Sequence, residues 1–322
     1  MDSLQLRLQQ MEYTNGRSPS LDREFSLGEK IWNGLRDLVY HNNHNKLKNR
    51  SLDNIVQRVP QKSSILAEDV VSDIIQSGRK NLEYPLLFPA EHNYFKAVGL
   101  DSKFQTGFHR ELRELAEGII SAYINRGLDE VQKGLIDFSA QNTYKEASAA
   151  ADRLGVNATK KKLELARAIV LKYVEKGLSE VEHNLIDYSA QLSRDNATSA
   201  AKKYGVTDVR NDISGLEIAI VLKYVENGLK HVQQNLIDHS AQESYKKAAS
   251  LDGKYRTNAG EEISGLGRAI VMRYISNGIE HAQGGRDYSA KTSYDGANTL
   301  SKLFRIDVSN ELLSLQRLIQ TK

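Results

Sequence analysis

One segment of this sequence recurs four times, and its spacing limits what the chain can fold into. The segment reads AIVLKYVEKGLSEVEHNLIDYSAQ at residues 168–191, and related copies occupy residues 118–141, 219–242 and 269–291. Their tyrosines lie at positions 123, 173, 224 and 274, so the steps are 50, 51 and 50 residues. Tandem copies at such a period are typical of arrays in which each unit buries the apolar face of its neighbour.

The composition fits a folded protein and excludes several kinds of site. Apolar residues make up 40% of the chain and charged residues 26%, which argues against wholesale disorder. There is no cysteine, so disulfides, thiolate metal sites and cysteine nucleophiles are excluded. The net charge of +3 is spread along the chain, whereas a nucleic-acid-binding protein usually shows a concentrated basic face.

Nothing in the sequence predicts a membrane segment. The first residues, MDSLQLRLQQMEY, lack the apolar core of a signal peptide. The longest purely apolar run of the repeats, AIVL, is far shorter than the roughly 20 residues of a membrane-spanning helix. We therefore expect a soluble, cytoplasmic protein without a membrane partner.

The repeats divide the chain into three parts. Residues 1–19 are polar and are expected to form a flexible N-terminus, and residues 20–106 are expected to form a helical N-terminal region without visible relation to the repeats. Four tandem repeats should follow, with a C-terminal half-repeat that caps the last apolar face. The bounds of these parts are about 107–156, 157–206, 207–257, 258–306 and 307–322.

Each repeat is predicted to contain a long helix A, a short helix B and a long helix C. In the second repeat, Leu165, Ile169 and Tyr173 lie at i, i+4 and i+8, which places them on one face of helix A. An alanine-rich stretch that ends at Gly205 indicates helix C. The expected fold is all-α, an α-solenoid-like array of four helical repeats wound as a short right-handed superhelix.

Two columns of residues are predicted to end helices. The first follows the tyrosines by four residues and is interpreted as the left-handed C′ residue of helix A. It comprises Gly127, Gly177, Gly228 and Gly278. The second comprises Gly134, Asn184, Asn235 and Gly284. Gly and Asn tolerate a positive φ, so this column is interpreted as the end of helix B. The fourth copy lacks one residue here, which a loop tolerates and a helix does not.

An aspartate occupies the same place in every repeat, within the motif Asp-aromatic-Ser-Ala. The four are Asp137, Asp187, Asp238 and Asp287. One interpretation is that each caps helix C, because its carboxylate can accept bonds from unpaired backbone N–H groups at the positive helix end. The other is that the carboxylates and hydroxyls form a ladder that binds a cation or a peptide backbone. We favour the cap, because position and residue type suffice for it.

The tyrosines and the basic residues form a second candidate surface. Tyrosines in a groove would suit stacking on bases or peptide groups, but a Tyr four residues after a buried Ile is more often part of the core. The basic positions that could contact acidic partners or phosphates are Lys172, Lys223, Arg273, Arg153, Lys203 and Lys254. Glu164, Glu175 and Glu226 lie close by in sequence, which favours a solvated face with local ion pairs.

Catalytic and cofactor motifs are absent from the sequence. There is no glycine-rich phosphate loop and no His-Glu-x-x-His run, so no cofactor is predicted. His41 and His44 lie in an Asn-rich segment without a further ligand nearby, so we predict no metal site. Glu91 and His92 beside Tyr94 form the least implausible acid–base pair, but nothing else completes a catalytic constellation.

These observations favour a non-enzymatic scaffold or adaptor that binds a macromolecular partner, in the first place a protein, through an extended repeat surface. Two alternatives stay open. One is an RNA- or ribonucleoprotein-binding protein that uses the Lys/Arg and Tyr columns. The other is an enzyme with its site in the N-terminal region, near Glu91 and His92.

Overall fold

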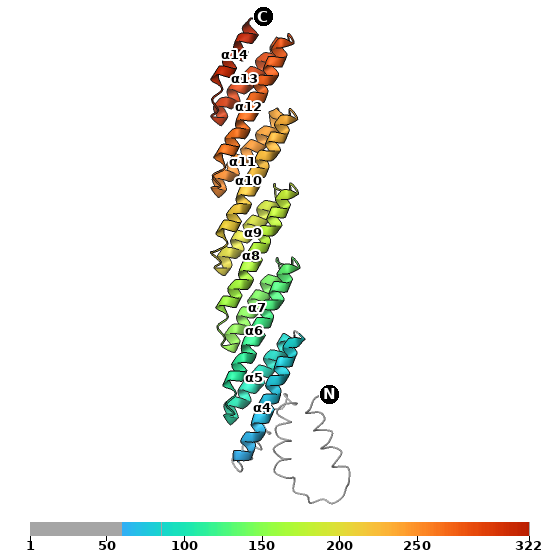
Figure 1. Ribbon diagram of the computed structural model, residues 1–322, viewed down its shortest axis with the longest axis vertical. Coiled ribbons are helices and arrows are strands. Elements are labelled where there is room, and N and C mark those ends of the chain that lie inside the picture. The colour runs from blue at the N-terminus through green and yellow to red at the C-terminus, as the bar shows by residue number, and fades with distance from the viewer. Residues whose placement is uncertain (1–59, 85, 322) are drawn as a thin grey trace, which may run out of the picture. The chain divides into compact units, whose positions relative to one another are not determined.

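The computed structural model describes residues 60–84 and 86–321 of the chain. The expected flexible N-terminus, the helices expected between residues 20 and 59 and the pair His41 and His44 lie outside the described residues. Within them, every regular element is a helix and none is a strand, which confirms the all-α prediction (Figure 1). None of these helices has the length and apolar composition that crossing a bilayer requires.

Long and short helices alternate along the described chain. The long helices, of 24 residues each, are α4 (Pro60–Glu83), α6 (His109–Gln132), α8 (Thr159–Glu182), α10 (Arg210–Gln233) and α12 (Gly260–Gln283). The short helices are α5 (Leu87–Phe104), α7 (Ser139–Leu154), α9 (Ser189–Tyr204), α11 (Gln242–Tyr255) and α13 (Asp287–Phe304). The final helix, α14 (Ser309–Gln320), has 12 residues but packs against α12 and α13 as a long helix does, so it belongs to the long-helix layer. A π-helical turn, η1 (Ile237–Ala241), leads into α11.

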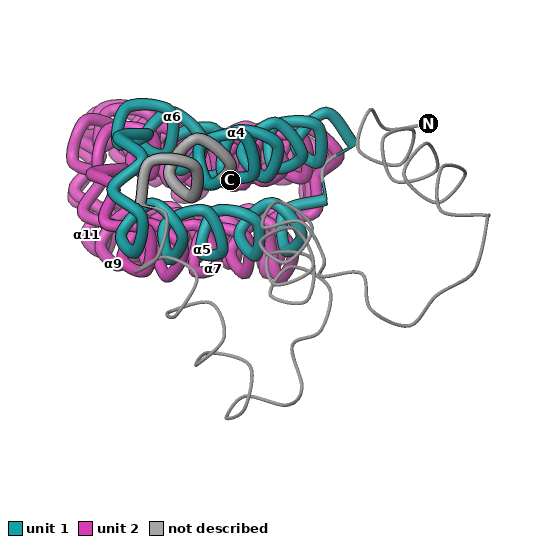
Figure 2. Tube along the Cα trace, turned by 90° about the horizontal axis from the view of Figure 1, so that it is seen from below, with its two compact units in different colours: residues 1–119 teal, residues 120–322 magenta. Residues whose placement is uncertain are grey.

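The chain divides into two compact units, residues 1–119 and residues 120–322, and the division falls within α6 (Figure 2). In the described part of the first unit, α4 packs against α5, and Asn93 of α5 donates a hydrogen bond to Ser77 of α4 over 3.2 Å. α4 also meets the beginning of α6, where Arg79 donates to Glu114 over 2.7 Å.

In the second unit, each long helix packs against the short helix that follows it and against the next long helix. The long helices therefore form one layer, and the short helices form a second layer on top of it (Figure 2). Each short helix also contacts the long helix of the following pair. Because the pairs follow one another in the same orientation, their long-to-short turns lie in a row along one side (Figure 1).

Repeated apolar columns form the core of this second unit. Leucines on the long-layer helices are wholly buried at equivalent positions: Leu165, Leu216, Leu266 and Leu315. Isoleucines one turn later are buried as well: Ile169, Ile220 and Ile270. Burying one such side chain contributes about 1.5–3 kcal/mol, so these columns are the main attraction between neighbouring pairs. On the short helices and the turns before them, buried alanines occupy the contact positions and let the helices approach closely: Ala140, Ala190, Ala241 and Ala290.

The structure corrects the prediction that helices A and B are separate. α8 runs through Gly177 to Glu182 as one helix, so Gly177 is not a C′ residue. Its backbone is not in the left-handed region. A glycine is needed there because a Cβ on residue 177 would lie 2.6 Å from Cδ2 of the buried Leu216. Gly127, Gly228 and Gly278 lie inside their helices in the same way, against Leu165, Leu266 and Leu315.

The second predicted column does end the long helices. Gly134, Asn184 and Asn235 have φ values of 76°, 61° and 59°, and in the shortened fourth copy Gly285 takes this role with φ 70°. In the second repeat, Leu185 N–H donates to Glu180 C=O over 2.8 Å, which closes the helix end in the manner of a Schellman motif. The one-residue deletion at 284–286 therefore falls in a turn, as predicted.

The pair α4–α5 has a likeness to the later pairs that sequence analysis did not detect. Its long helix also has 24 residues, and a Cβ on Gly78 would lie 2.9 Å from Leu115, the same relation that Gly177 has to Leu216. Ala67, Val70 and Val71 are buried at the positions that correspond to Ala166, Ile169 and Val170. The tyrosine of the later repeats is replaced here by Ile74, which hid the resemblance.

Candidate functional site

The aspartate column does not cap the short helices. α7 and α9 begin after Phe138 and Tyr188, and neither helix has a side-chain cap. Backbone groups already close the turn, because Ala190 N–H donates to Leu185 C=O over 3.1 Å. The cap interpretation is therefore wrong for Asp137 and Asp187. Asp287 instead lies in the first turn of α13, whose preceding residue, Arg286, also makes no side-chain cap bond.

Each of three aspartates accepts a hydrogen bond from the tyrosine of the next long helix. Tyr173 donates to Asp137 over 2.8 Å, Tyr224 donates to Asp187 over 2.7 Å, and Tyr274 donates to Asp238. Tyr173 and Tyr224 are buried, as the core interpretation expects, and their hydroxyl bonds to the aspartates are half-buried. Burial, followed by the bond to the aspartate, raises the pKa of each of these tyrosines.

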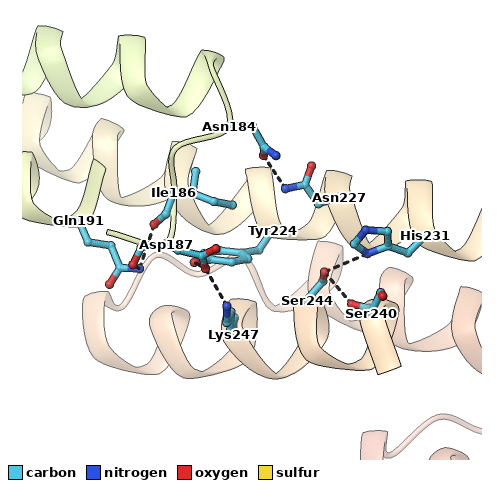
Figure 3. Close-up of polar contacts among 10 residues, drawn as sticks. All are labelled: Asn184, Ile186, Asp187, Gln191, Tyr224, Asn227, His231, Ser240, Ser244 and Lys247. Carbon is cyan, nitrogen blue, oxygen red and sulfur yellow. Dashed lines mark hydrogen bonds and ion pairs between the residues drawn. The ribbon is translucent and has the colours of Figure 1, made fainter. Parts of the chain in front are cut away.

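Asp187 contacts two side chains of the next helix pair (Figure 3). Besides the hydroxyl of Tyr224, its Oδ1 meets the ammonium of Lys247 on α11 at 2.7 Å. The bond from Lys247, followed by that from Tyr224, lowers the pKa of Asp187. The adjacent Asn184 accepts a bond from Asn227 of α10 over 2.6 Å. The turn after α8 is thus tied to the next helix pair at two points.

A second polar column links α6, α8 and α10 each to the short helix that follows it. Thr143 donates to Glu130 over 2.7 Å, and Ser193 donates to Glu180 over 2.6 Å. In the third repeat this glutamate is replaced by His231, whose Nδ1 lies 3.4 Å from the hydroxyl of Ser244 (Figure 3). These contacts are half-buried, which gives the column a structural role.

The predicted basic positions are occupied by contacts within the protein. Lys172 pairs with Glu175, and Lys223 pairs with Glu226, each at 2.9 Å, as the solvated-face interpretation expects. Arg273 donates to Asn235 over 3.1 Å. On the short helices, Lys203 and Lys254 lie over the rings of Tyr204 and Tyr255 at 4.9 and 5.1 Å. Arg153 lies in the last turn of α7. The structure does not bring these six residues together into one site.

A polar groove lies between the turns of the pairs α8–α9 and α10–α11. It has a volume of about 710 Å³ and is lined by the end of α8, the following turn, α10, η1 and α11. Its charged lining residues are Glu182, Asp187, Lys223, Lys230, Glu243 and Lys247. His183, His231 and His239 also contribute. We call it the inter-turn groove.

Large apolar side chains project from successive turns into solvent. The aromatic residues that follow the aspartates are Phe138, Tyr188 and Tyr288, with exposed fractions of 80%, 73% and 87%. Leu135, Leu185 and Leu236, each three residues before the aromatic position of its turn, are about half exposed. We call these six residues the turn edge. Sequence analysis treated the aromatic position only as part of the aspartate motif, although its recurrence beside a turn was visible.

The two residues of the N-terminal acid–base pair differ in burial. Glu91 is buried within α5, whereas its neighbour His92 is exposed, so the two side chains leave the helix in different directions. Tyr94 packs edge-on against Phe95. Among the described residues no group of three or more His, Asp or Glu side chains is arranged to hold a metal ion.

Comparisons with known proteins do not assign the site. No family model matches the chain, and no curated protein and no solved structure matches it significantly.

Proposed function

We propose that this protein is a non-enzymatic scaffold that binds a protein partner along the turn edge. In this proposal the helix pairs of the second unit form an α-solenoid-like array, with the two-helix pair as its repeat. Such arrays present the same positions of each repeat along one side, so a partner can contact several turns at once. The last described helix, α14, packs against α12 and α13 in the place that the next long helix has in the earlier pairs.

The observation that supports this proposal is the exposure of Phe138, Tyr188 and Tyr288. Aromatic side chains so far exposed contribute little to a folded core, and contiguous apolar surface on a soluble protein marks interaction sites. Aromatic residues are also enriched at the energetic centres of protein interfaces. Here they recur at equivalent turns, on the side where the turns lie in a row (Figure 1).

The contacts of the Lys/Arg and Tyr columns do not favour the RNA alternative. Tyr173 and Tyr224 are buried, so their rings offer no face on which a base could stack. Lys172 and Lys223 already pair with glutamates. Binding to a phosphate backbone would have to break these pairs.

Affinity capture from the native host tests the proposal. The tagged full chain is compared with a variant that carries Phe138→Ala, Tyr188→Ala and Tyr288→Ala. A matched control carries Leu163→Ala, Leu303→Ala and Leu313→Ala, which are also exposed but lie near the opposite ends of their helices. We expect proteins that are retained by the wild type and by the control to be lost from the edge variant. Equal retention by all three chains, measured by quantitative mass spectrometry, would contradict it.

A further inference from the structure

The inter-turn groove contains charges of both signs, and each lysine that lines it already contacts a carboxylate of the protein. Lys223 and Lys230 both pair with Glu226, at 2.9 and 2.5 Å. Lys247 pairs with Asp187 at 2.7 Å. An anionic ligand in the groove would therefore compete with carboxylates of the protein for every lysine that lines it.

The other carboxylates of the groove have no partner within the described part of the chain. Glu182 and Glu243 line it, and neither forms an ion pair or a side-chain hydrogen bond with any described residue. Glu243 is half-buried, so part of its hydration is lost without compensation from these residues. A cation that entered the groove would supply the missing partner.

The combination of these two carboxylates occurs in this groove alone among the described repeats. In the other three repeats detected in the sequence, the positions equivalent to Glu182 are Gln132, Gln233 and Gln283. Those equivalent to Glu243 are Asn142, Leu192 and Thr292. All six are uncharged. The π-helical turn η1, which leads into the helix that carries Glu243, is also specific to the third repeat within the described chain.

Exposed apolar residues in the turns next to the groove indicate what kind of molecule carries the cation. The turn that contributes Asn184, Ile186 and Asp187 to the groove also exposes Leu185 and Tyr188, and Leu236 is exposed just before η1. A Lys or Arg side chain with apolar neighbours combines an aliphatic stem with a charged end. It would place its charge between the carboxylates and its neighbours on these apolar residues. The volume of about 710 Å³ is sufficient for one or more such side chains.

We propose that the inter-turn groove receives a Lys or Arg side chain of the partner, flanked by apolar residues that pack on Leu185 and Leu236. This inference rests on the proposed function, because it assigns the partner's chemistry at one position of the turn edge. Binding in this groove would fix which part of the partner lies on the third repeat, and therefore which parts lie on the other turns, which are otherwise alike.

Fluorescence anisotropy with two labelled peptide probes tests the inference on the full chain. One peptide alternates Lys and Leu, and the other, of equal length, alternates Glu and Leu. We expect the Lys peptide to bind and the Glu peptide not to bind. In the variant Glu182→Gln with Glu243→Gln, the affinity for the Lys peptide should fall about tenfold, as expected for the loss of charge-assisted bonds. The control Glu164→Gln with Glu261→Gln removes the same charge from exposed sites at other helix ends and should bind as the wild type does.

The outcomes separate this inference from the proposed function. Equal affinity of the wild type and the groove variant for the Lys peptide would overturn the groove assignment, as would absence of binding by the wild type. The scaffold function would survive either result if host proteins still depended on Phe138, Tyr188 and Tyr288. Conversely, capture that is indifferent to those three residues would remove the scaffold proposal even if the groove bound the Lys peptide as expected.

Discussion

The hydroxyl of Tyr224 donates a hydrogen bond to Asp187 over 2.7 Å, although the two residues are 37 positions apart and belong to different helix pairs. Tyr173 and Asp137 stand in the same relation one pair earlier, separated by 36 positions. The bond therefore joins neighbouring repeats instead of completing the end of one helix. It explains why the motif contains both residues in consecutive copies, since Asp137, Asp187 and Asp238 each accept a bond from the tyrosine of the next copy.

A double-mutant cycle distinguishes this bond from a helix cap. Asp187→Ala should lower the free energy of unfolding by about 1–3 kcal/mol, because the hydroxyl of the buried Tyr224 loses its acceptor. In a protein that already carries Tyr224→Phe, Asp187→Ala should cost much less, because no hydroxyl is left to lose its acceptor. The difference between the two costs is the coupling energy, which should be at least about 0.5 kcal/mol. Asp187→Asn, which keeps an acceptor oxygen, should cost less than Asp187→Ala. Additive effects of the two changes in urea unfolding would show that the bond between Tyr224 and Asp187 does not contribute to stability.

The raised pKa of Tyr224 predicts a loss of stability in alkali. Burial and the bond to Asp187 keep the phenol protonated in the folded state, whereas in the unfolded chain it ionises near its usual pKa. The contribution is present below about pH 10, the unfolded value, and is lost as the pH rises toward the folded value. Urea unfolding between about pH 8 and 11 should therefore show a steeper fall for the wild type than for Tyr224→Phe. Parallel curves would mean that the phenol is not protected.

The glycine inside α8 gives a prediction opposite to helix propensity. Gly177→Ala should destabilise by roughly 1–3 kcal/mol, because the new Cβ meets the buried Leu216 and the Cβ of Ser193. Gly215→Ala is the matched control within α10. Its Cβ would meet nothing within 4 Å, so this change should stabilise by up to about 1 kcal/mol. Thermal unfolding of both variants measures these changes in stability. A Gly177→Ala variant more stable than the wild type would contradict the close contact between residue 177 and Leu216.

The two glycine-containing columns show which features of a helix can be predicted from the local sequence and which cannot. Asn184 was recognisable as a helix end, since its type and the nearby deletion both report on the backbone of its own turn. Gly177 has the same residue type as a C′ glycine, but its reason is the side chain of Leu216 in the next long helix. A single sequence does not show directly that a glycine and a distant leucine are in contact. The only signal is that a leucine follows each glycine at a similar distance along the chain, as Leu115 follows Gly78.

The aspartates illustrate the same limit for the site. Ahead of a short helix, Asp187 has the type and position of a cap, and local rules are satisfied by that interpretation. Its actual partners, Tyr224 and Lys247, lie in the next helix pair. The turn edge could have been predicted from the sequence, because aromatic residues such as Phe138 and Tyr188 recur at one position that packing does not explain. Only the fold shows that this position faces solvent.

Two equivalent interfaces between neighbouring helix pairs differ at a pair of contacting positions. We therefore expect that changing both positions together costs less stability than changing one. In one interface Tyr245 stacks on Phe304 at 3.9 Å above Gly267, where a Cβ would lie 3.0 Å from the ring of Tyr245. In the equivalent interface Arg194 takes the place of the tyrosine, lies 4.4 Å from the ring of Tyr255 and pairs with the buried Glu217. The glutamate thus stands where the other interface has its glycine.

Arg194→Tyr alone should therefore destabilise by about 3 kcal/mol or more, because Glu217 is left buried without its cation. Adding Glu217→Gly should recover much of that loss, since a tyrosine facing a glycine is the combination that the next interface already uses in Tyr245 and Gly267. Glu217→Gly alone should remain destabilised, because Arg194 then loses its partner and the helix gains a flexible residue. Chemical unfolding of the three variants measures the coupling. A double variant no more stable than Arg194→Tyr would show that the two interfaces are not interchangeable, and that the register of the pairs depends on more than these positions.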